Sequence, residues 1–159
     1  ASSRNQEVAV AKAWVLEFPT LLSALKLGAA AHLGRLFPPL LAWLHARDDA
    51  TAIGAASCLE LLCMMTWPRV PNHAASIWSD IARAYTEADA RGGGQTTQLF
   101  RITLERLAAI VQLACGEKFE EVWRAACIEP IPAQLAPLIS FLENLPGRDG
   151  VSNEWHMQA

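Results

Sequence analysis

The chain lacks the long apolar runs and the charge excess that would commit it to a membrane or to a polyanion. No charge-free apolar run reaches the roughly 18 residues of a membrane-spanning helix, because Arg35, Asp48 and Glu60 interrupt the best candidates. The net charge is only −3, from 13 Lys and Arg against 16 Asp and Glu. So small a charge gives no overall field to attract a phosphate backbone or an anionic bilayer. We therefore expect no membrane partner, and the composition disfavours nucleic acid.

Residues that could bind a metal or a phosphate, or take part in catalysis, are few and scattered along the chain. The histidines have no further ligand at metal-binding spacing, and no two cysteines have the short spacing of a zinc site. The glycines at 92–94 follow a helix end rather than a strand, so they lack the context of a phosphate-binding loop. No nucleophile stands beside a base and an orienting group. The sequence predicts no metal, no cofactor and no catalytic site, and hence a protein that is not an enzyme.

The four cysteines all fall within predicted helices: Cys58, Cys63, Cys115 and Cys127. We expect them to fill core space as reduced thiols, which indicates a cytoplasmic or nuclear protein. The first residues contain neither an initiator Met nor a signal peptide. This start is typical of a piece of a longer protein.

Ala and Leu supply much of the hydrophobic 52% of the chain, and there is one Tyr. This composition favours close helix packing over sheets. With 159 residues the chain has the length of one domain. The sequence therefore predicts an all-α fold.

The stretch 36–67 is the most informative, because it reads as two apolar helices joined by a short acidic turn. We predict a helix over 30–46, kinked or restarted at Pro38-Pro39, and a partner helix over 50–66. Asp48 or Asp49 is placed to cap the second helix. A pair this apolar cannot hide both faces alone, so it requires similar pairs stacked beside it.

Similar apolar spacing continues along the chain, broken by prolines and glycines. Further helices are predicted at 5–17, 21–27, 74–88, from 96 or 97 to 115, at 118–127 and at 133–145. On the longest helix, Glu105 stands one turn from Arg101 and is expected to pair with it. The sequence divides into a helical-repeat segment, 1–146, and a flexible C-terminal tail, 147–159.

Several short motifs carry a resemblance to known families. Pro39-Leu40-Leu41, Asp48-Asp49, Ala55-Ala56 and Leu59-Glu60-Leu61-Leu62 resemble the HEAT/armadillo repeat pattern. The basic residue common early in the second helix of such repeats is replaced here by Thr51-Ala52-Ile53-Gly54. Thr66-Trp67-Pro68-Arg69 looks like the repeat ending of the Tel-interacting subunits of the TTT co-chaperone complex, particularly the second of them.

The resemblance implies an α-solenoid that acts as a protein–protein interaction scaffold. Its expected partners are other HEAT-repeat subunits and Hsp90-linked factors that mature phosphatidylinositol-3-kinase-related kinases. Trp67 is expected to pack between repeats, and Arg69 to cap the preceding helix or to reach a partner. Trp155, in the tail, is a further candidate anchor. The candidate partner-binding residues are therefore Trp67, Arg69 and Trp155.

Two alternatives remain open at this point. One is a nucleic-acid-binding helical-repeat protein, with arginines along a groove and tryptophans that stack on bases. The arginines concerned are Arg35, Arg47, Arg69, Arg83, Arg91, Arg101 and Arg106, and the tryptophans Trp43, Trp67, Trp78 and Trp123. The other is a small all-α enzyme that uses cysteine or histidine chemistry.

Overall fold

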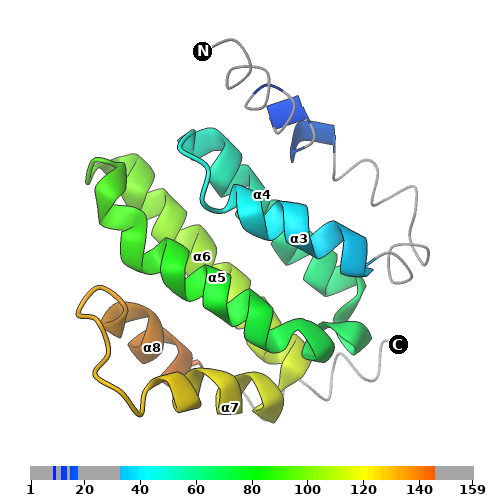
Figure 1. The fold of residues 1–159 in the computed structure, drawn as a ribbon, viewed down its shortest axis with the longest axis vertical. Helices are drawn as coiled ribbons and strands as arrows, with labels where there is room; N and C mark the ends of the chain where they lie inside the picture. The colour runs from blue at the N-terminus through cyan, green and yellow to red at the C-terminus, as the bar shows by residue number, and fades with distance from the viewer. Residues whose placement is uncertain (1–8, 10–11, 14, 18–32, 146–159) are drawn as a thin grey trace.

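The computed structural model describes residues 9, 12–13, 15–17 and 33–145. Throughout these residues the secondary structure is helical with no strand, which confirms the predicted all-α class (Figure 1). The α-helices are α3 (Leu33–Trp43), α4 (Asp49–Met65), α5 (Ala74–Thr86), α6 (Gln95–Cys115), α7 (Glu117–Ala126) and α8 (Ala136–Glu143). Two 3-10 segments, η1 (Trp67–His73) and η2 (Glu87–Arg91), follow α4 and α5.

The first described pair, α3 and α4, matches the predicted acidic hinge. The Asp48 carboxylate accepts the Thr51 backbone N–H at 3.0 Å and its hydroxyl at 2.6 Å, which caps α4 as predicted. The hydrogen bond from the Thr51 hydroxyl holds the pKa of Asp48 below its ordinary value. α3 itself runs through Pro38 and Pro39 as one helix, which excludes the restart, one of the two alternatives predicted there.

Helices pack both on the next helix in the chain and on the one after it, and the most extensive contact is between α4 and α6. α3 packs on α4, α4 lies along α6, α5 contacts both α6 and α7, and α8 rests on α6. In Figure 1, α3 and α5 lie in front of α4 and α6. The turns α3–α4, α5–α6 and α7–α8 lie at the left edge of that view. The largest fully buried side chains between the layers are Trp123, Tyr85, Phe37, Phe100 and Phe119.

The helical residues before α3 reach α4 at a glycine. A Cβ on Gly54 would overlap the Val15 side chain, and the Cys58 thiol donates to the Val15 carbonyl at 3.5 Å. A glycine inside a helix costs about 1 kcal/mol relative to alanine. Here it admits a close approach between two segments. The remainder of the predicted helix 5–17, the predicted helix 21–27 and the tail 147–159 lie outside the described residues.

Helix α4 ends where the prolines predict, but not with the expected cap. The Leu62 carbonyl accepts the Thr66 hydroxyl at 2.6 Å and the Thr66 backbone N–H at 3.0 Å. Within the described part of the chain, the exposed Arg69 side chain makes no hydrogen bond or ion pair. Of the two roles expected for Arg69, the structure therefore shows no capping of α4, and Thr66 makes the hydrogen bonds at this helix end.

Helix α6 ends at Gly116 as predicted, but its charged face pairs differently from the prediction. Arg101 binds Asp89 of η2, and Glu105 accepts the Tyr85 hydroxyl at 2.8 Å. The predicted Arg101–Glu105 pair is therefore wrong, because both side chains turn toward the segment preceding α6. At the other end, the Trp123 indole donates to the Gln112 side-chain carbonyl at 3.0 Å. The Gln112 amide in turn donates to the Gly116 carbonyl at 2.9 Å, which fixes the α6–α7 corner.

No single helix among the described residues has both the length and the apolar composition needed to cross a bilayer. α4 and the helical segment 67–91 meet that test only when taken together, across a bend of 119°. Many of the apolar side chains of α4 are buried in the core, which gives them a packing role within the fold.

Candidate functional site

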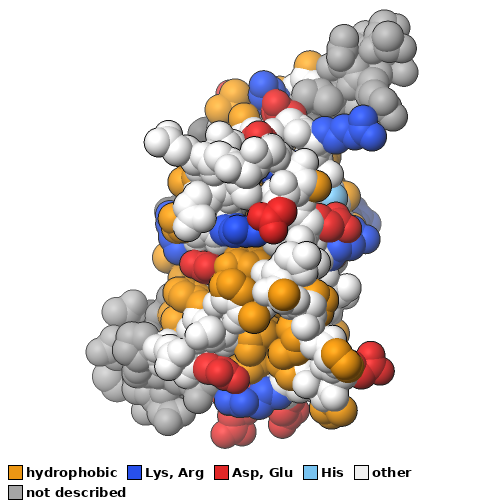
Figure 2. Space-filling view, turned by 90° about the vertical axis from the view of Figure 1, so that its left-hand side faces the viewer, with side chains coloured by type: hydrophobic (Ala, Val, Ile, Leu, Met, Phe, Trp, Pro, Cys, Tyr) orange, Lys and Arg blue, Asp and Glu red, His pale blue; other side chains and the backbone are white. Residues whose placement is uncertain are grey.

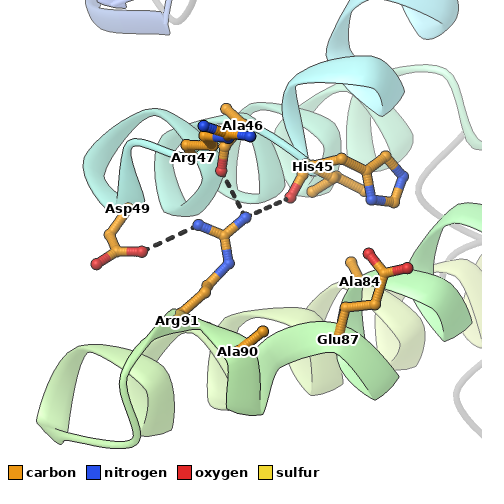
Figure 3. Close-up of a pocket in the computed structure, with 9 residues that line it drawn as sticks. His45, Ala46, Arg47, Asp49, Ala84, Glu87, Ala90 and Arg91 are labelled. Carbon is orange, nitrogen blue, oxygen red and sulfur yellow. Dashed lines mark hydrogen bonds and ion pairs between the residues drawn. The ribbon is translucent and has the colours of Figure 1, made fainter.

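The seam between α3 and α5 is hollowed by two cavities. One, of about 520 Å³, lies between the α3–α4 turn and the C-terminal end of α5. Its lining includes His45, Arg47, Glu87 and Arg91 (Figure 3). The second, of about 400 Å³, lies between the helices themselves and is lined by Gly34, Phe37, Pro38, Leu41, Ala42, His73, Ser76, Asp80 and Arg83. The seam therefore offers both apolar and charged groups to a ligand.

A histidine–carboxylate pair joins the two cavities. His45 lines the first cavity, and its Nε2 lies 2.8 Å from Oδ1 of Asp80, which lines the second. Arg83 approaches the same carboxylate oxygen at 3.4 Å. Among the described residues, Nδ1 of His45 is buried without a hydrogen-bond partner. The side chain thus ties the α3–α4 turn to α5 through one ring nitrogen, and no nucleophile of the described residues is hydrogen-bonded to it.

Arg91 closes the first cavity and is fully engaged within the protein. Figure 3 shows its guanidinium reaching across to the α3–α4 turn. It donates to the Asp49 carboxylate at 2.9 Å and to the carbonyls of Leu44 and Ala46 at 3.2 and 2.6 Å. It also lies over the Phe100 ring, 4.6 Å from the centroid. Arg91 is therefore a structural clasp between α3–α4 and α5–α6 and has little capacity left for a ligand.

The charged side chains that line the two cavities are of both signs. Arg35 and Arg47 are exposed and make no ion pair within the described residues, and the Arg83 side chain is 58% exposed. The carboxylates of Asp49 and Asp80 are each bound to a cationic or imidazole partner, which leaves Glu87 as the exposed carboxylate lining the first cavity. The two cavities are thus lined by three arginines, Arg47, Arg83 and Arg91, and by three carboxylates, Asp49, Asp80 and Glu87.

The two prolines of α3 remove the helical hydrogen-bond donors of one carbonyl. An Arg35 carbonyl in a helix would accept from the N–H of residue 39, or from residue 38 in a 3-10 turn. Both residues are proline and carry no N–H. The Arg35 carbonyl is consequently barred from both of these helical hydrogen bonds, in an exposed part of α3.

The predicted site residues lie elsewhere. Trp67 is half-buried and Arg69 exposed, both in η1, at the right edge of Figure 1. Because η1 packs against α5 and α6, this corner lies where one helix pair meets the next. Trp67 and Arg69 line neither cavity, although His73 at the end of the same segment lines the second, and Trp155 lies outside the described residues. Sequence reasoning missed the seam, because His45 and Asp80 are 35 residues apart with no shared motif.

Other surface features are apolar or mixed in charge. In Figure 2, hydrophobic side chains gather below the middle of the molecule, and cationic and anionic side chains are interspersed. Ile128 in the α7–α8 loop is 86% exposed, and Leu99 on α6 is 52% exposed. Arg101 and Arg106 are ion-paired with Asp89 and Glu60. Such pairs remove arginines from the track that the nucleic-acid alternative requires.

The cysteines have the character of core residues. Cys58 and Cys63 are buried, Cys115 and Cys127 are half-buried, and all four are free thiols. Burial raises the pKa of Cys58 to about 11 and that of Cys115 to about 12. A thiol with so high a pKa is a poor nucleophile at neutral pH. No group of three or more His, Cys, Asp or Glu residues suited to a metal occurs within the described ranges.

Comparison with known proteins adds one relative. The chain is 26% identical over 120 residues to an uncharacterized protein of Arabidopsis thaliana, At2g39910. The match covers 76% of this chain and 26% of the plant protein, so the chain spans about a quarter of that relative's length. No protein-family model matches the chain. No solved structure matches it either.

Proposed function

We propose that this protein is a helical-repeat scaffold of the HEAT/armadillo type that binds other proteins and catalyses no reaction. The observation that carries the proposal is the packing order, in which α4 lies along α6, α5 against α7 and α6 against α8. Helix pairs stacked in this way share their core only with neighbouring pairs, and such arrays serve as extended binding surfaces. The raised thiol pKa values and the structural role of Arg91 favour binding over chemistry.

The more specific part of the proposal is a co-chaperone role in the maturation of phosphatidylinositol-3-kinase-related kinases. It rests on the resemblance of Thr66-Trp67-Pro68-Arg69 to the Tel-interacting subunits. Thr66 satisfies the end of α4, so Arg69 is left exposed and available to a partner. The partners would be other HEAT-repeat subunits and Hsp90-linked factors, in the cytoplasm or the nucleus.

The test is affinity capture from eukaryotic cell extract, with captured proteins identified by mass spectrometry. We expect Tel-type HEAT proteins, Hsp90 adaptors or the large kinases. The exposed Arg69→Glu variant should lose them, whereas the matched Lys118→Glu variant on α7 should retain them. Capture of an unrelated complex would overturn the co-chaperone role and leave the scaffold. Capture of no protein above background would overturn the scaffold as well.

Nucleic-acid binding is the alternative function, and the exposed Arg35, Arg47 and Arg83 are the observation in its favour. Its test is titration with duplex and single-stranded DNA at low salt. Electrostatic binding would weaken steeply as salt is raised. We expect no binding, because the paired arginines and interspersed carboxylates break up the positive surface.

A further inference from the structure

We propose that the connection between α7 and α8, residues 128–134, is a docking segment for a partner domain whose groove is lined by aromatic side chains. This inference rests on the proposed scaffold function and adds to it a second binding surface and the chemistry of the partner. The segment is separate from the one that carries Trp67 and Arg69, because it joins the last two helices that the structure describes.

The docking segment is exposed along its whole length. Every side chain from 128 to 134 is exposed, and Ile128 and Ile131 are 86% and 36% exposed. The two 3-10 connections differ, since η1 buries Val70 and η2 buries Ala88. Figure 1 shows the docking segment as a loop at the lower left edge of the molecule. The two isoleucines therefore add little to the core, and their apolar surface is available to a partner.

Two prolines keep the middle of the docking segment extended. Proline holds φ at about −65° and disfavours the helical conformation in the residue before it. Pro130 and Pro132 therefore restrict Glu129 and Ile131 as well as themselves. Residues 130–132 accordingly belong to neither a helix nor a turn. Such a stretch favours the polyproline II conformation, and a partner that binds it pays little entropy for ordering it.

The fold holds both ends of the docking segment. Before it, the Cys127 backbone N–H donates to the Arg124 carbonyl at the end of α7, at 3.0 Å. After it, the Leu135 N–H donates to the Pro132 carbonyl at 2.9 Å. Leu135 is buried, which anchors the start of α8. The extended residues are thus presented between two fixed points.

The backbone of the extended residues has unused hydrogen-bond acceptors. The carbonyls of Glu129, Pro130 and Ile131 accept no hydrogen bond from the part of the chain that the structure describes. The segment therefore offers free carbonyls beside two proline rings and an isoleucine. A groove lined by Trp and Tyr matches both features, because its ring faces are apolar and its indole N–H or phenol O–H can donate. Aromatic-lined grooves are the sites that bind polyproline II segments.

The test begins with a photo-crosslinking amino acid at Ala133, which is exposed beside Pro132, in the full chain. The matched control carries the same label at Lys118, which is exposed on α7. After crosslinking in cell extract, the attached partner peptide is sequenced by mass spectrometry. We expect the label at Ala133 to attach next to a Trp or Tyr of a partner that the Lys118 label does not capture.

The partner domain that contains this peptide, once purified, is the probe for affinity. Replacing both prolines, by Pro130→Ala with Pro132→Ala, should weaken binding about tenfold, because the preformed conformation is lost. Ile131→Ser should also weaken it about tenfold, through loss of an apolar contact. Pro137→Ala changes an exposed proline in the first turn of α8 and should alter the dissociation constant by less than about twofold. All these side chains are exposed, so each variant should retain the melting temperature of the parent.

Several results would overturn the docking segment. They are attachment of the Ala133 label away from any Trp or Tyr, or to nucleic acid, or to a second copy of this chain. An unchanged dissociation constant in the double proline variant or in Ile131→Ser would overturn it too. If Ala133 captures no protein while the affinity capture that depends on Arg69 succeeds, the docking segment is wrong and the scaffold stands. If neither captures a protein, the scaffold itself is wrong.

Discussion

At the scale of single residues, Arg91 shows how one side chain can hold two parts of the fold together. Its fork reaches two carbonyls of the α3–α4 turn and the Asp49 carboxylate at once. A lysine carries the same charge but has no planar fork. The contribution of Arg91 therefore lies in geometry as much as in charge.

We predict that Arg91→Lys lowers the free energy of unfolding by about 1–3 kcal/mol, because at least one buried carbonyl loses its donor. Urea denaturation followed by circular dichroism measures the change. Arg47→Lys is the matched control, since Arg47 is exposed and makes no ion pair within the described residues. The control should stay within about 0.5 kcal/mol of the parent. Equal effects in both variants would contradict the clasp.

The buried thiols predict a loss of stability in alkaline solution. The unfolded thiols titrate near 9.0, whereas burial raises the pKa of Cys58 to about 11 and that of Cys115 to about 12. The unfolded state therefore loses protons first, and the stability present below pH 9.0 falls as pH rises toward these values. We expect the free energy of unfolding, measured by urea denaturation, to fall between pH 8 and pH 10, by about 1 kcal/mol at pH 10 for each of these two thiols.

The control for this prediction is Cys58→Ala, which removes one titrating group. Its own cost should be roughly constant at low pH, and its free energy of unfolding should fall less than that of the parent above pH 9.0. A parallel fall in both proteins would assign the alkaline loss to other groups.

At the scale of elements, the corner between α6 and α7 depends on a backbone conformation rather than on hydrophobic pattern. Gly116 ends α6 at φ 59° and ψ −132°, a region that L side chains rarely adopt. The Gln112 amide donates to its carbonyl, and Trp123 donates to Gln112. The direction of α7 therefore follows from one glycine and one buried hydrogen-bonded chain.

Gly116→Ala should cost about 1–3 kcal/mol through backbone strain alone, since no atom lies within 4 Å of the added Cβ. Thermal unfolding measures it. Gly34→Ala is the matched control, because Gly34 lies within α3 with no positive φ and an equally open surrounding. There alanine should be neutral or stabilise by up to about 1 kcal/mol. A similar loss at both glycines would rule out strain at the corner.

At the scale of the whole molecule, the proposed stacking of helix pairs predicts that local stability varies with position along the chain. α7 and α8 lie at one end of the described helices and rest on α5 and α6. Trp123 is fully buried there. Because α7 and α8 are held through a few large side chains, we expect this helix pair to unfold locally while the other helices stay folded.

We predict that Trp123→Ala destabilises the α7–α8 pair by about 3–5 kcal/mol. The amides of α7 and α8 should then lose their protection from hydrogen exchange, while those of α3 and α4 keep theirs. Amide hydrogen exchange with mass spectrometry resolves the two regions. Leu59→Ala in α4 is the comparison, because Leu59 is fully buried near the other end of the described array and should show the reverse pattern. Uniform loss of protection in both variants would indicate one cooperative unit and contradict the proposed stacking of helix pairs.

Interactions between residues close in the chain make much of this architecture predictable from the sequence. Apolar residues at helical spacing predict α4 and α6 within a few residues, because burying one stripe is what stabilises such helices. The Asp48 cap is predictable, since the cap and the N–H groups it accepts lie within one turn. Gly116 is likewise predictable as a helix end. Each of these features depends on a short stretch of chain.

Only the tertiary structure decided the pairings between distant segments. His45 meets Asp80 across 35 residues, and Arg91 reaches Ala46 across 45. Arg101 binds Asp89 of the preceding segment rather than Glu105, which lies one helical turn further along α6. Side-chain contacts of this kind depend on how the helix layers stack. The spacing of apolar residues and the capping residues do not specify that stacking. The sequence alone thus determined the helices and their ends, whereas stacking created the α3–α5 seam and its cavities.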